Sequence, residues 1–570
     1  MTNDPLPHRA WRYLAAALGC ALLLAATAAR AADSFLPASA PFDATETRIP
    51  MRDGAELAAD VYLPRDTTGR PWPVVLIQTP YDKSGVRPWF QGEGRWGERS
   101  LFTDTAYAFV VTDWRGRAAS AAAARPGRAV PGGADDGYDT VEWIAAQPWS
   151  NGKIGTWGPS ALGAAQFRTA SARPPHLVCA VPVVMPLNLT YDIYFPGGAL
   201  WEEFTRTLGR LGWDLYGQLT ANPIAGTPFW RRLEESNHLR PESIDLPMLL
   251  IGGWFDIYVD AVIDTFARLR AEAGPRTREH SRLVMGPWLH RTDNEEVGAL
   301  RFPDAIGGGI DRGRSFFDRW LRGIETPEEV NRPAITYFEM TAAADLEWRG
   351  QWRSAPTWPP PGSSDRRFFL DPAADALTSR PPATASSDRY RYDPSDPLPT
   401  PGGHVLTPTL PSGPRDLRPI ESRADVVVYT SAPLESAVAL AGRPRVELWV
   451  ASDRPDTDVT AFLAHVDRDG RSILLVEGVL RLRFRESTTR TTPLVPGEVY
   501  RVEVELDHLA MRLVPGDRLR LVVSSSNYPK YAKNLNDGGA MYGDGAGLVA
   551  TNQVWGGAER PSALVLPVVE

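Results

Sequence analysis

The stretch GKIGTWGPSALGAAQFRTA, residues 152–170, decides how this chain is interpreted. It opens as a short apolar run, reaches Ser160 between Gly158 and Gly163, and continues as an alanine-rich segment that favours a helix. A strand, a sharp turn and a helix in this order lift the side chain of the turn residue above a sheet. The second glycine comes one residue later than in the usual G-x-S-x-G motif. Two interpretations of Ser160 are therefore open: a nucleophile, or a small residue in a tight turn.

Apolar runs of strand length lie on both sides of this stretch. They are rich in β-branched and aliphatic residues, and helix-length segments separate them. Continuous apolar strands that alternate with helices predict a parallel sheet covered on both faces. One helix is predicted over residues 136–147, ended by Pro148. The other predicted strands are WPVVLIQTP (72–80), YAFVVTDWRG (107–116), LVCAVPVV (177–184), LPMLLIGGW (246–254) and RLVMGPW (282–288).

Two further segments differ in character from this α/β pattern. Residues 188–240 are rich in aromatic residues and favour short helices, which predicts a cap above the strand ends. After Pro/Gly-rich segments near 355–415, runs such as RPRVELWVASD (443–453) alternate with period two, which predicts an antiparallel β-sandwich of jelly-roll size. The predicted units are a hydrolase-like α/β domain in two parts (32–187 and 241–357), the cap (188–240) and the C-terminal β domain (358–570).

Residues 1–31 predict a secretory signal peptide. Arg9 and Arg12 precede an apolar run from Tyr13 to Ala29, and small residues stand at −3 and −1 of a cleavage site before Ala32. The run is short for a membrane span, so we expect a periplasmic or secreted protein with no membrane attachment after cleavage. Removing three arginines and one aspartate takes the net charge from −8 to −10.

Composition excludes several classes of partner and cofactor. No basic stripe is present, so a nucleic-acid partner is not expected. Only Cys179 remains after signal cleavage, which excludes an internal disulfide. No zinc or EF-hand spacing exists, and acidic turns explain Asp456-Thr-Asp458 and Asn536-Asp-Gly-Gly better than calcium ligation. We therefore predict no metal and no cofactor, and the sequence leaves a homo-oligomer open.

A nucleophilic serine needs a base and an orienting acid, and both belong at the ends of later strands. His290 is the one histidine that directly follows an apolar strand after Ser160. Asp256 closes the strand before it, whereas Asp260 lies four residues further on and fits the start of a helix. The alternatives are a solvated loop histidine at 290 and a helix N-cap at Asp256, which can also serve both roles. The other histidines of the mature chain are His176, His238, His280, His404, His465 and His508.

Tyr81 directly follows the strand predicted at 72–80, in the sequence IQTPYDK. A phenol at a strand end can donate a hydrogen bond to a developing oxyanion, together with the backbone N–H of Ala161. The sequence fits a buried structural tyrosine equally well. Tyr258 and the cap residue Trp201 are further candidates, as substrate-binding residues.

These residues, in this order, resemble the cocaine-esterase and Xaa-Pro dipeptidyl-peptidase-like serine hydrolases. That group also includes α-amino-acid ester hydrolases and glutaryl cephalosporin acylases. The likeness covers nearly the whole mature chain, through the motifs TPYDK (79–83), DWRGR (113–117), GTWGPSALG (155–163), GGWFD (252–256), GPWLH (286–290), YDPSDPLPTPGG (392–403) and SSSNYPKYAKNLNDG (524–538).

The resemblance implies an α/β-hydrolase domain with a helical cap insertion and a C-terminal jelly roll. It implies Ser160, Asp256 and His290 as the triad, with Tyr81 and the Ala161 amide as oxyanion donors. In this family the late glycine after the serine is expected. Residue 161 departs from the family pattern, because tyrosine is usual there.

We therefore expect an exported serine hydrolase that cleaves a small-molecule ester or amide through an acyl-enzyme, as an acyl esterase. The alternative within the enzyme class is an aminoacyl amidase, a dipeptidyl-peptidase or an α-amino-acid ester hydrolase. Such an enzyme needs a carboxylate for the substrate α-ammonium group, and Glu202 and Glu203 in the cap are the candidates, although two surface acids on a helix are commoner. A rival from another class is a surface-binding jelly-roll protein with an inactive hydrolase domain.

Overall fold

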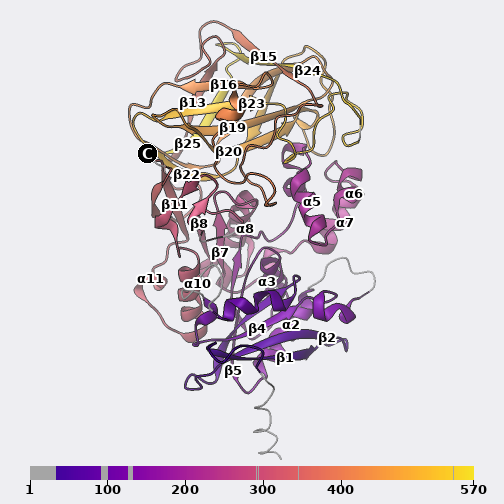
Figure 1. The fold of residues 1–570 in the computed structure, drawn as a ribbon, viewed down its shortest axis with the longest axis vertical. Coiled ribbons are helices and arrows are strands. Elements are labelled where there is room, and N and C mark those ends of the chain that lie inside the picture. The colour runs from indigo at the N-terminus through magenta and orange to yellow at the C-terminus, as the bar shows by residue number, and fades with distance from the viewer. Residues whose placement is uncertain are drawn as a thin grey trace, which may run out of the picture.

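The computed structural model describes residues 34–91, 101–125, 133–290, 292, 294–343, 346–543 and 545–570. The predicted signal peptide, 1–31, lies outside these residues. Figure 1 shows three parts: an α/β part, a set of short helices beside its upper end, and a β-rich domain that covers both. The predicted fold class is confirmed.

A mixed sheet forms the centre of the α/β part. Its strand order is β1-β2-β4-β3-β5-β6-β7-β8-β11-β12. The ladders from β4 to β11 are all parallel, as the apolar runs predict, because strands buried on both faces need no polar alternation. The six predicted strands correspond to β3 (Trp72–Thr79), β4 (Ala108–Asp113), β5 (Ser150–Pro159), β6 (Leu177–Val183), β7 (Leu249–Gly253) and β8 (Arg282–Gly286).

Four strands of this sheet do not follow from the continuous apolar runs. The hairpin β1 (Phe42–Pro50) and β2 (Glu56–Pro64) begins the sheet, and β11 (Ile335–Thr341) and β12 (Arg349–Ala355) end it. Along β1, buried residues alternate with more exposed ones because it is an edge strand. β11 pairs with β8 and, through Met340 and Met511, also with β22 (Leu509–Leu513) of the C-terminal domain.

Helices cover both faces of the sheet. On one face, α2 (Ala134–Ala145) and α3 (Ala161–Ser171) lie side by side, and α2 matches the helix predicted over 136–147. On the other face, α10 (Ile310–Phe317) packs so closely that a Cβ at Gly155 of β5 would lie 2.8 Å from the Phe317 ring. Further helices are α8 (Val259–Glu272), α9 (Pro275–His280) and α11 (Pro327–Val330). Within the described residues, no helix is both long and apolar enough to cross a membrane.

The cap consists of α4 (Tyr191–Tyr194), α5 (Glu202–Arg210), α6 (Tyr216–Ala221) and α7 (Pro228–Asn237). Several of its aromatic residues form its own core: the rings of Tyr191 and Phe195 stack at 5.0 Å, and Trp230 meets Tyr191 edge-on at 5.1 Å. In Figure 1 these helices lie between the α/β part and the β domain.

The C-terminal domain is built mainly from antiparallel ladders, with one parallel pair between β14 and β16. One runs β16-β23-β19-β20 and another runs β15-β24-β18-β25-β13. Its strands are β13 (Ser363–Asp371), β14 (Ala376–Thr378), β15 (Ser386–Tyr392), β16 (Val427–Ser431), β17 (Val438–Gly442), β18 (Arg445–Ser452), β19 (Asp458–Val466), β20 (Ser472–Arg481), β21 (Tyr500–Glu505), β23 (Arg518–Ser524), β24 (Ala550–Gly556) and β25 (Ala563–Val569).

Buried ion pairs occupy the acidic turn considered above for calcium. The Asp458 carboxylate accepts two hydrogen bonds from Arg481, both at 2.9 Å, and the Asp456 carboxylate accepts one from Arg483 at 2.6 Å. Asn534 donates to both carboxylates. The guanidinium groups therefore supply the positive charge that a metal would otherwise supply.

Candidate active site

Ser160 occupies the sharp turn between β5 and α3. Its backbone lies at φ 54° and ψ −125°, a region that non-glycine residues rarely adopt. Such strain persists only where the surrounding structure enforces it, and it gathers at functional sites. Here the Ser160 amide donates to the carbonyl of Val183 on β6 at 3.0 Å, and its carbonyl accepts from Gly163 at 2.7 Å. The strand–turn–helix context therefore favours the nucleophile over the plain turn residue.

The late glycine has a packing reason. A Cβ on Gly163 would lie 2.8 Å from the Cβ of Met185, closer than side-chain atoms approach. Gln166, one helical turn further along α3, donates from its amide to the carbonyls of Gly158 and Val181, both at 3.1 Å. Gln166 therefore holds the end of β5 against β6 just before the Ser160 turn. Sequence reasoning missed this role because a glutamine in a helix has no distinctive pattern.

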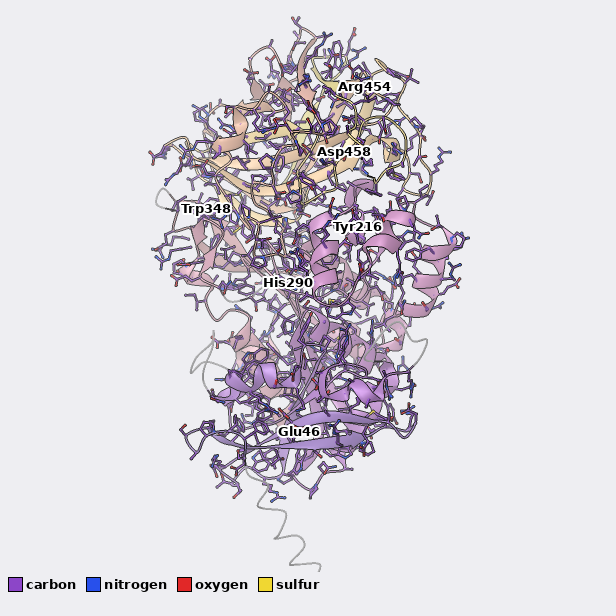
Figure 2. All side chains as sticks on the ribbon, turned by 45° about the vertical axis from the view of Figure 1, so that its right-hand side comes forward. Glu46, Tyr216, His290, Trp348, Arg454 and Asp458 are labelled. Atoms are coloured by element: carbon purple, nitrogen blue, oxygen red, sulfur yellow. The ribbon has the colours of Figure 1, made fainter. Side chains whose placement is uncertain are left out.

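Asp256 and His290 lie at the carboxyl ends of β7 and β8, and the structure brings them together. The Nδ1 atom of His290 is 2.6 Å from Oδ2 of Asp256, and Asp256 is fully buried. The other carboxylate oxygen accepts from the backbone N–H of Tyr258 at 2.9 Å, just before α8 begins. Asp256 therefore holds a helix start and a histidine at once. Figure 2 shows His290 near the middle of the molecule, between the α/β part and the β domain.

Tyr81 follows β3 and meets Ser160. Burial raises the pKa of the Tyr81 phenol, and a hydrogen bond to Ser160 and the charge of Arg117 oppose that rise only in part. The hydroxyl therefore remains protonated at neutral pH and can donate. The residue as a whole is 43% exposed, although its hydroxyl end meets Ser160, and its ring contacts the Trp213 ring edge-on with the ring centres 5.7 Å apart. The guanidinium carbon of Arg117 lies 5.0 Å from the centre of the Trp213 ring. Ala161 begins α3, so its N–H has no acceptor within the helix.

The turn that carries Tyr81 is fastened by a carboxylate that sequence reasoning did not single out. Asp113, at the end of β4, accepts from the backbone N–H of Lys83 at 2.6 Å and from that of Ala119 at 3.1 Å. Burial raises the pKa of this carboxyl, and the two amides offset that effect in part. One signal was available: Asp113 directly follows the apolar and β-branched part, 108–112, of the strand predicted over 107–116.

Of the two predicted substrate-binding residues, only Tyr258 contacts the proposed triad. Its ring lies 5.7 Å from the His290 ring, and burial together with Tyr194, Asp256 and Tyr81 raises its pKa well above the ordinary value. Trp201 instead packs against the C-terminal domain, with the Lys530 ammonium 4.8 Å from its ring centre. Its role in substrate binding stays a prediction.

The cap carboxylates are buried, which corrects the expectation of two surface acids. Glu203 accepts from the backbone N–H of Thr407 at 2.6 Å, so it ties α5 to the C-terminal domain. Glu202 accepts from Arg206 at 2.6 Å. Both carboxylates therefore already have hydrogen-bond donors within the fold.

Comparison with known proteins identifies this architecture. Residues 53–220 and 218–292 match the family model "X-Pro dipeptidyl-peptidase (S15 family)", and residues 329–565 match the model of the X-Pro dipeptidyl-peptidase C-terminal non-catalytic domain. Cocaine esterase from Rhodococcus sp. (strain MB1 Bresler) is 33% identical over 92% of this chain and 98% of its own length.

Two solved structures share the fold. An aminopeptidase from a marine sediment Thaumarchaeota archaeon superposes with a TM-score of 0.78 at 24% identity, over 95% of this chain and 99% of its own. An α-amino acid ester hydrolase superposes with a TM-score of 0.77 at 24% identity, over 94% and 98%. Together with the family models and the likeness to cocaine esterase, they lead to one conclusion: the chain belongs to the S15 and cocaine-esterase family and is a serine hydrolase.

Proposed function

We propose that this hydrolase cleaves carboxylic esters through an acyl-enzyme, with Ser160, His290 and Asp256 as its triad. His290 takes the proton of the Ser160 hydroxyl as the oxygen attacks the ester carbonyl, and then returns it to the leaving alcohol. A water molecule then attacks the acyl-enzyme carbonyl while His290 takes its proton, and the acid is released as Ser160 recovers its proton from His290. Asp256 holds the proton on Nδ1 of His290, so that Nε2 is free to act as the base.

One observation carries the proposal: the 2.6 Å contact between Nδ1 of His290 and the buried Asp256 carboxylate, in a sheet whose strand β5 ends in a serine held at positive φ. A buried carboxylate on a histidine is also found in purely structural pairs. A purely structural pair would not need a strained serine at the end of β5 in the same sheet, in contact with Tyr81.

Tyr81 and the Ala161 N–H are the proposed oxyanion donors. The Tyr81 hydroxyl already meets Ser160, so a short rearrangement places it against the developing negative oxygen. Ala161 supplies the first free amide of α3, at the positive end of the helix dipole. Two donors from two different strand ends fix the position of the oxygen.

An ester without an α-ammonium group is the proposed substrate class. Glu202 and Glu203, the cap carboxylates considered for an ammonium group, accept hydrogen bonds from Arg206 and from the Thr407 backbone. Arg117 places a positive charge near Tyr81. These contacts disfavour a cationic aminoacyl group, so esters of uncharged acids are expected to be cleaved faster than aminoacyl amides.

Ser160→Ala tests the proposal, with Ser171→Ala at the far end of α3 as the matched control. We expect the first variant to lose hydrolysis of p-nitrophenyl butyrate by about 10⁴-fold or more and to lose labelling by a fluorophosphonate probe, and the control to keep both. A Ser160→Ala protein that still hydrolyses the ester at the control rate contradicts the proposal. Comparing that ester with alanyl-prolyl-p-nitroanilide tests the substrate class.

We also propose that the chain is exported and loses residues 1–31. The support is the sequence pattern alone: arginines, an apolar run and a small-residue cleavage site. Sequencing the N-terminus of the protein recovered outside the cytoplasm should begin at Ala32. A protein retained inside with Met1 intact contradicts this.

A further inference from the structure

His404 belongs to the C-terminal β domain but reaches into the hydrolase part. Its side chain is buried, and Nε2 lies 2.9 Å from the carbonyl oxygen of Trp254. Trp254 stands two residues before Asp256, in the loop that follows β7. A residue of the domain that the family model describes as non-catalytic therefore bonds to the loop that carries the proposed triad acid.

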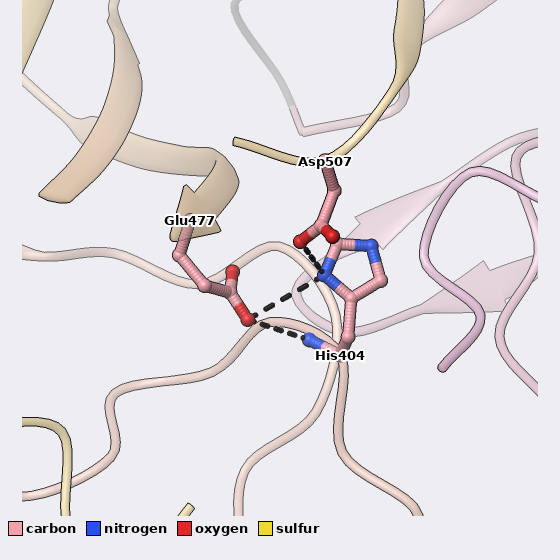
Figure 3. A group of neighbouring side chains, drawn as sticks. All are labelled: His404, Glu477 and Asp507. Atoms are coloured by element: carbon pink, nitrogen blue, oxygen red, sulfur yellow. Dashed lines mark hydrogen bonds and ion pairs between the residues drawn. The ribbon is translucent and has the colours of Figure 1, made fainter. Parts of the chain in front are cut away.

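The other ring nitrogen of His404 faces carboxylates. Nδ1 lies 2.9 Å from Oδ2 of Asp507 and 3.4 Å from Oε1 of Glu477 (Figure 3). Nε2 faces a carbonyl oxygen and Nδ1 faces two carboxylates at ion-pair distance, so these contacts favour a proton on each nitrogen, that is, an imidazolium. Burial by itself would lower the pKa of His404, but Asp507 and Glu477 raise it well above the ordinary value.

A metal is the alternative occupant of this cluster, since the donor atoms of His404, Glu477 and Asp507 all lie within 4.8 Å of one another. One contact opposes it. Lys530 forms an ion pair with Glu477, so the Lys530 ammonium and a protonated His404 balance the two carboxylates without a metal. The cluster is a charge-balanced ionic network, and its imidazolium is the member that bonds to the hydrolase part.

The backbone N–H, the backbone carbonyl and the indole N–H of Trp254 all form hydrogen bonds. Its backbone N–H donates to the carbonyl of Gly286 at 2.8 Å, and its indole N–H donates to the carbonyl of Phe338 at 2.9 Å. The next residue, Phe255, donates to the carbonyl of Trp288 at 3.0 Å, two residues before His290. The two backbone bonds join the acid loop to the end of β8 and the histidine loop, the indole bond joins it to β11, and His404 adds a bond to the Trp254 carbonyl.

The segment around His404 reaches the other side of the site as well. Within residues 401–415, Pro414 accepts from the N–H of Ala299, in the segment that follows His290. Thr407 donates to Glu203 at the start of the cap helix α5. One stretch of the β domain therefore contacts the acid loop, the chain beyond the histidine and the cap.

We propose that the His404 imidazolium is a positioning residue that holds the Asp256 loop in register with His290, so that the C-terminal domain takes part in catalysis without touching the substrate. This rests on the proposed triad. Displacing a catalytic group by about 1 Å can cost about 100-fold in rate, and the 2.6 Å contact between Asp256 and His290 leaves little room for displacement.

His404→Gln tests this, because glutamine can still donate to Trp254 but carries no charge and cannot donate in both directions. The matched control is His465→Gln: His465 is a buried histidine of the same domain, with Nε2 3.2 Å from Asp517. We expect His404→Gln to lower kcat for p-nitrophenyl butyrate by 10- to 100-fold with KM within about 3-fold. We also expect the acidic limb of the kcat/KM profile to move to lower pH, because a loosened Asp256 stabilises the His290 imidazolium less.

A purely structural role would lower the melting temperature without moving kcat or the pH profile, and that result would overturn the proposal. If His404→Gln does not fold, Asp507→Asn is the second variant: Asp507 is 26% exposed, and the change removes the charge of one of the two carboxylates that face Nδ1. It should shift the profile in the same direction by a smaller amount, and an unchanged profile overturns the proposal. Ser160→Ala distinguishes failure of this proposal from failure of the proposed triad. If Ser160→Ala keeps its activity, the triad itself is wrong, independently of the result for His404→Gln.

Discussion

Replacing Asp256 with asparagine is expected to lower kcat by about 10⁴-fold while leaving the fold intact. The two side chains have the same shape, so the change is in hydrogen-bond polarity. In the wild type, both carboxylate oxygens accept: Oδ1 from the Tyr258 N–H at 2.9 Å and Oδ2 from Nδ1 of His290 at 2.6 Å. Asparagine has one accepting oxygen and one donating NH₂ group in these two positions.

The backbone determines which way the asparagine turns. The Tyr258 N–H can only donate, so the amide oxygen must face it and the NH₂ group must face His290. Nδ1 must then accept, which moves the ring proton to Nε2, the atom that should take the proton of Ser160. A base in the wrong tautomer costs about 10⁴-fold, or about 5.5 kcal/mol of transition-state stabilisation.

Steady-state hydrolysis of p-nitrophenyl butyrate between pH 6 and 10 measures the effect, and thermal unfolding checks the fold. The control is Asp260→Asn, four residues along, where the carboxylate accepts from the His508 N–H and pairs with Arg443 instead of His290. We expect it to retain kcat within about 3-fold, because tautomer control is not involved. An Asp256→Asn enzyme within 10-fold of the wild type, or an equal loss in both variants, would refute the reasoning.

Three further predictions concern the surroundings of Ser160. Tyr81→Phe removes one oxyanion donor and should lower kcat by about 100-fold with little change in KM; a loss below about 3-fold would mean that Tyr81 is structural. Ala161→Tyr places a large ring beside the nucleophile and should slow p-nitrophenyl octanoate hydrolysis more than p-nitrophenyl acetate hydrolysis; equal slowing of both esters contradicts a role in acyl size. Arg117→Gln removes a positive charge that lowers the pKa of Tyr81, so the pKa of Tyr81 should rise. The basic limb of the kcat/KM profile, where Tyr81 deprotonates, should then move to higher pH. A shift of that limb to lower pH excludes this electrostatic link.

The sequence predicts the parallel strands and the residues at their ends because both are local properties. A strand buried on both faces appears as an unbroken apolar run, and the residue after its last apolar position stands at the carboxyl edge of the sheet. Ser160, Asp256 and His290 all follow such runs. Tyr81 does too, and the structure adds its contact with Ser160.

The contacts that cross between domains could not be predicted in this way. Glu203 has the pattern of an exposed helix residue, and it is buried only because the backbone at Thr407, 204 residues later, donates to it. His404 lies in a Pro/Gly-rich segment that favours an irregular loop, and the structure confirms that loop. Its hydrogen bond to Trp254 joins residues 150 positions apart, which no local pattern indicates. The run GVLRLRFRES (478–487) predicts a strand, yet β20 ends at Arg481 and a 3-10 turn, Leu482–Phe484, follows.

The strand β11 makes the division of the chain into units ambiguous. It pairs along its first half with β8 of the α/β sheet and at its last two residues with β22 of the C-terminal domain. Composition sets the boundary at 357/358, whereas the family model of the C-terminal domain already begins at 329. A protein engineer who wished to exchange the C-terminal domain between relatives would therefore find no clean place to cut. A junction before β11 takes the last parallel strand away from the sheet, and a junction after it leaves the β22 partner behind, so recombination should preserve both pairings together.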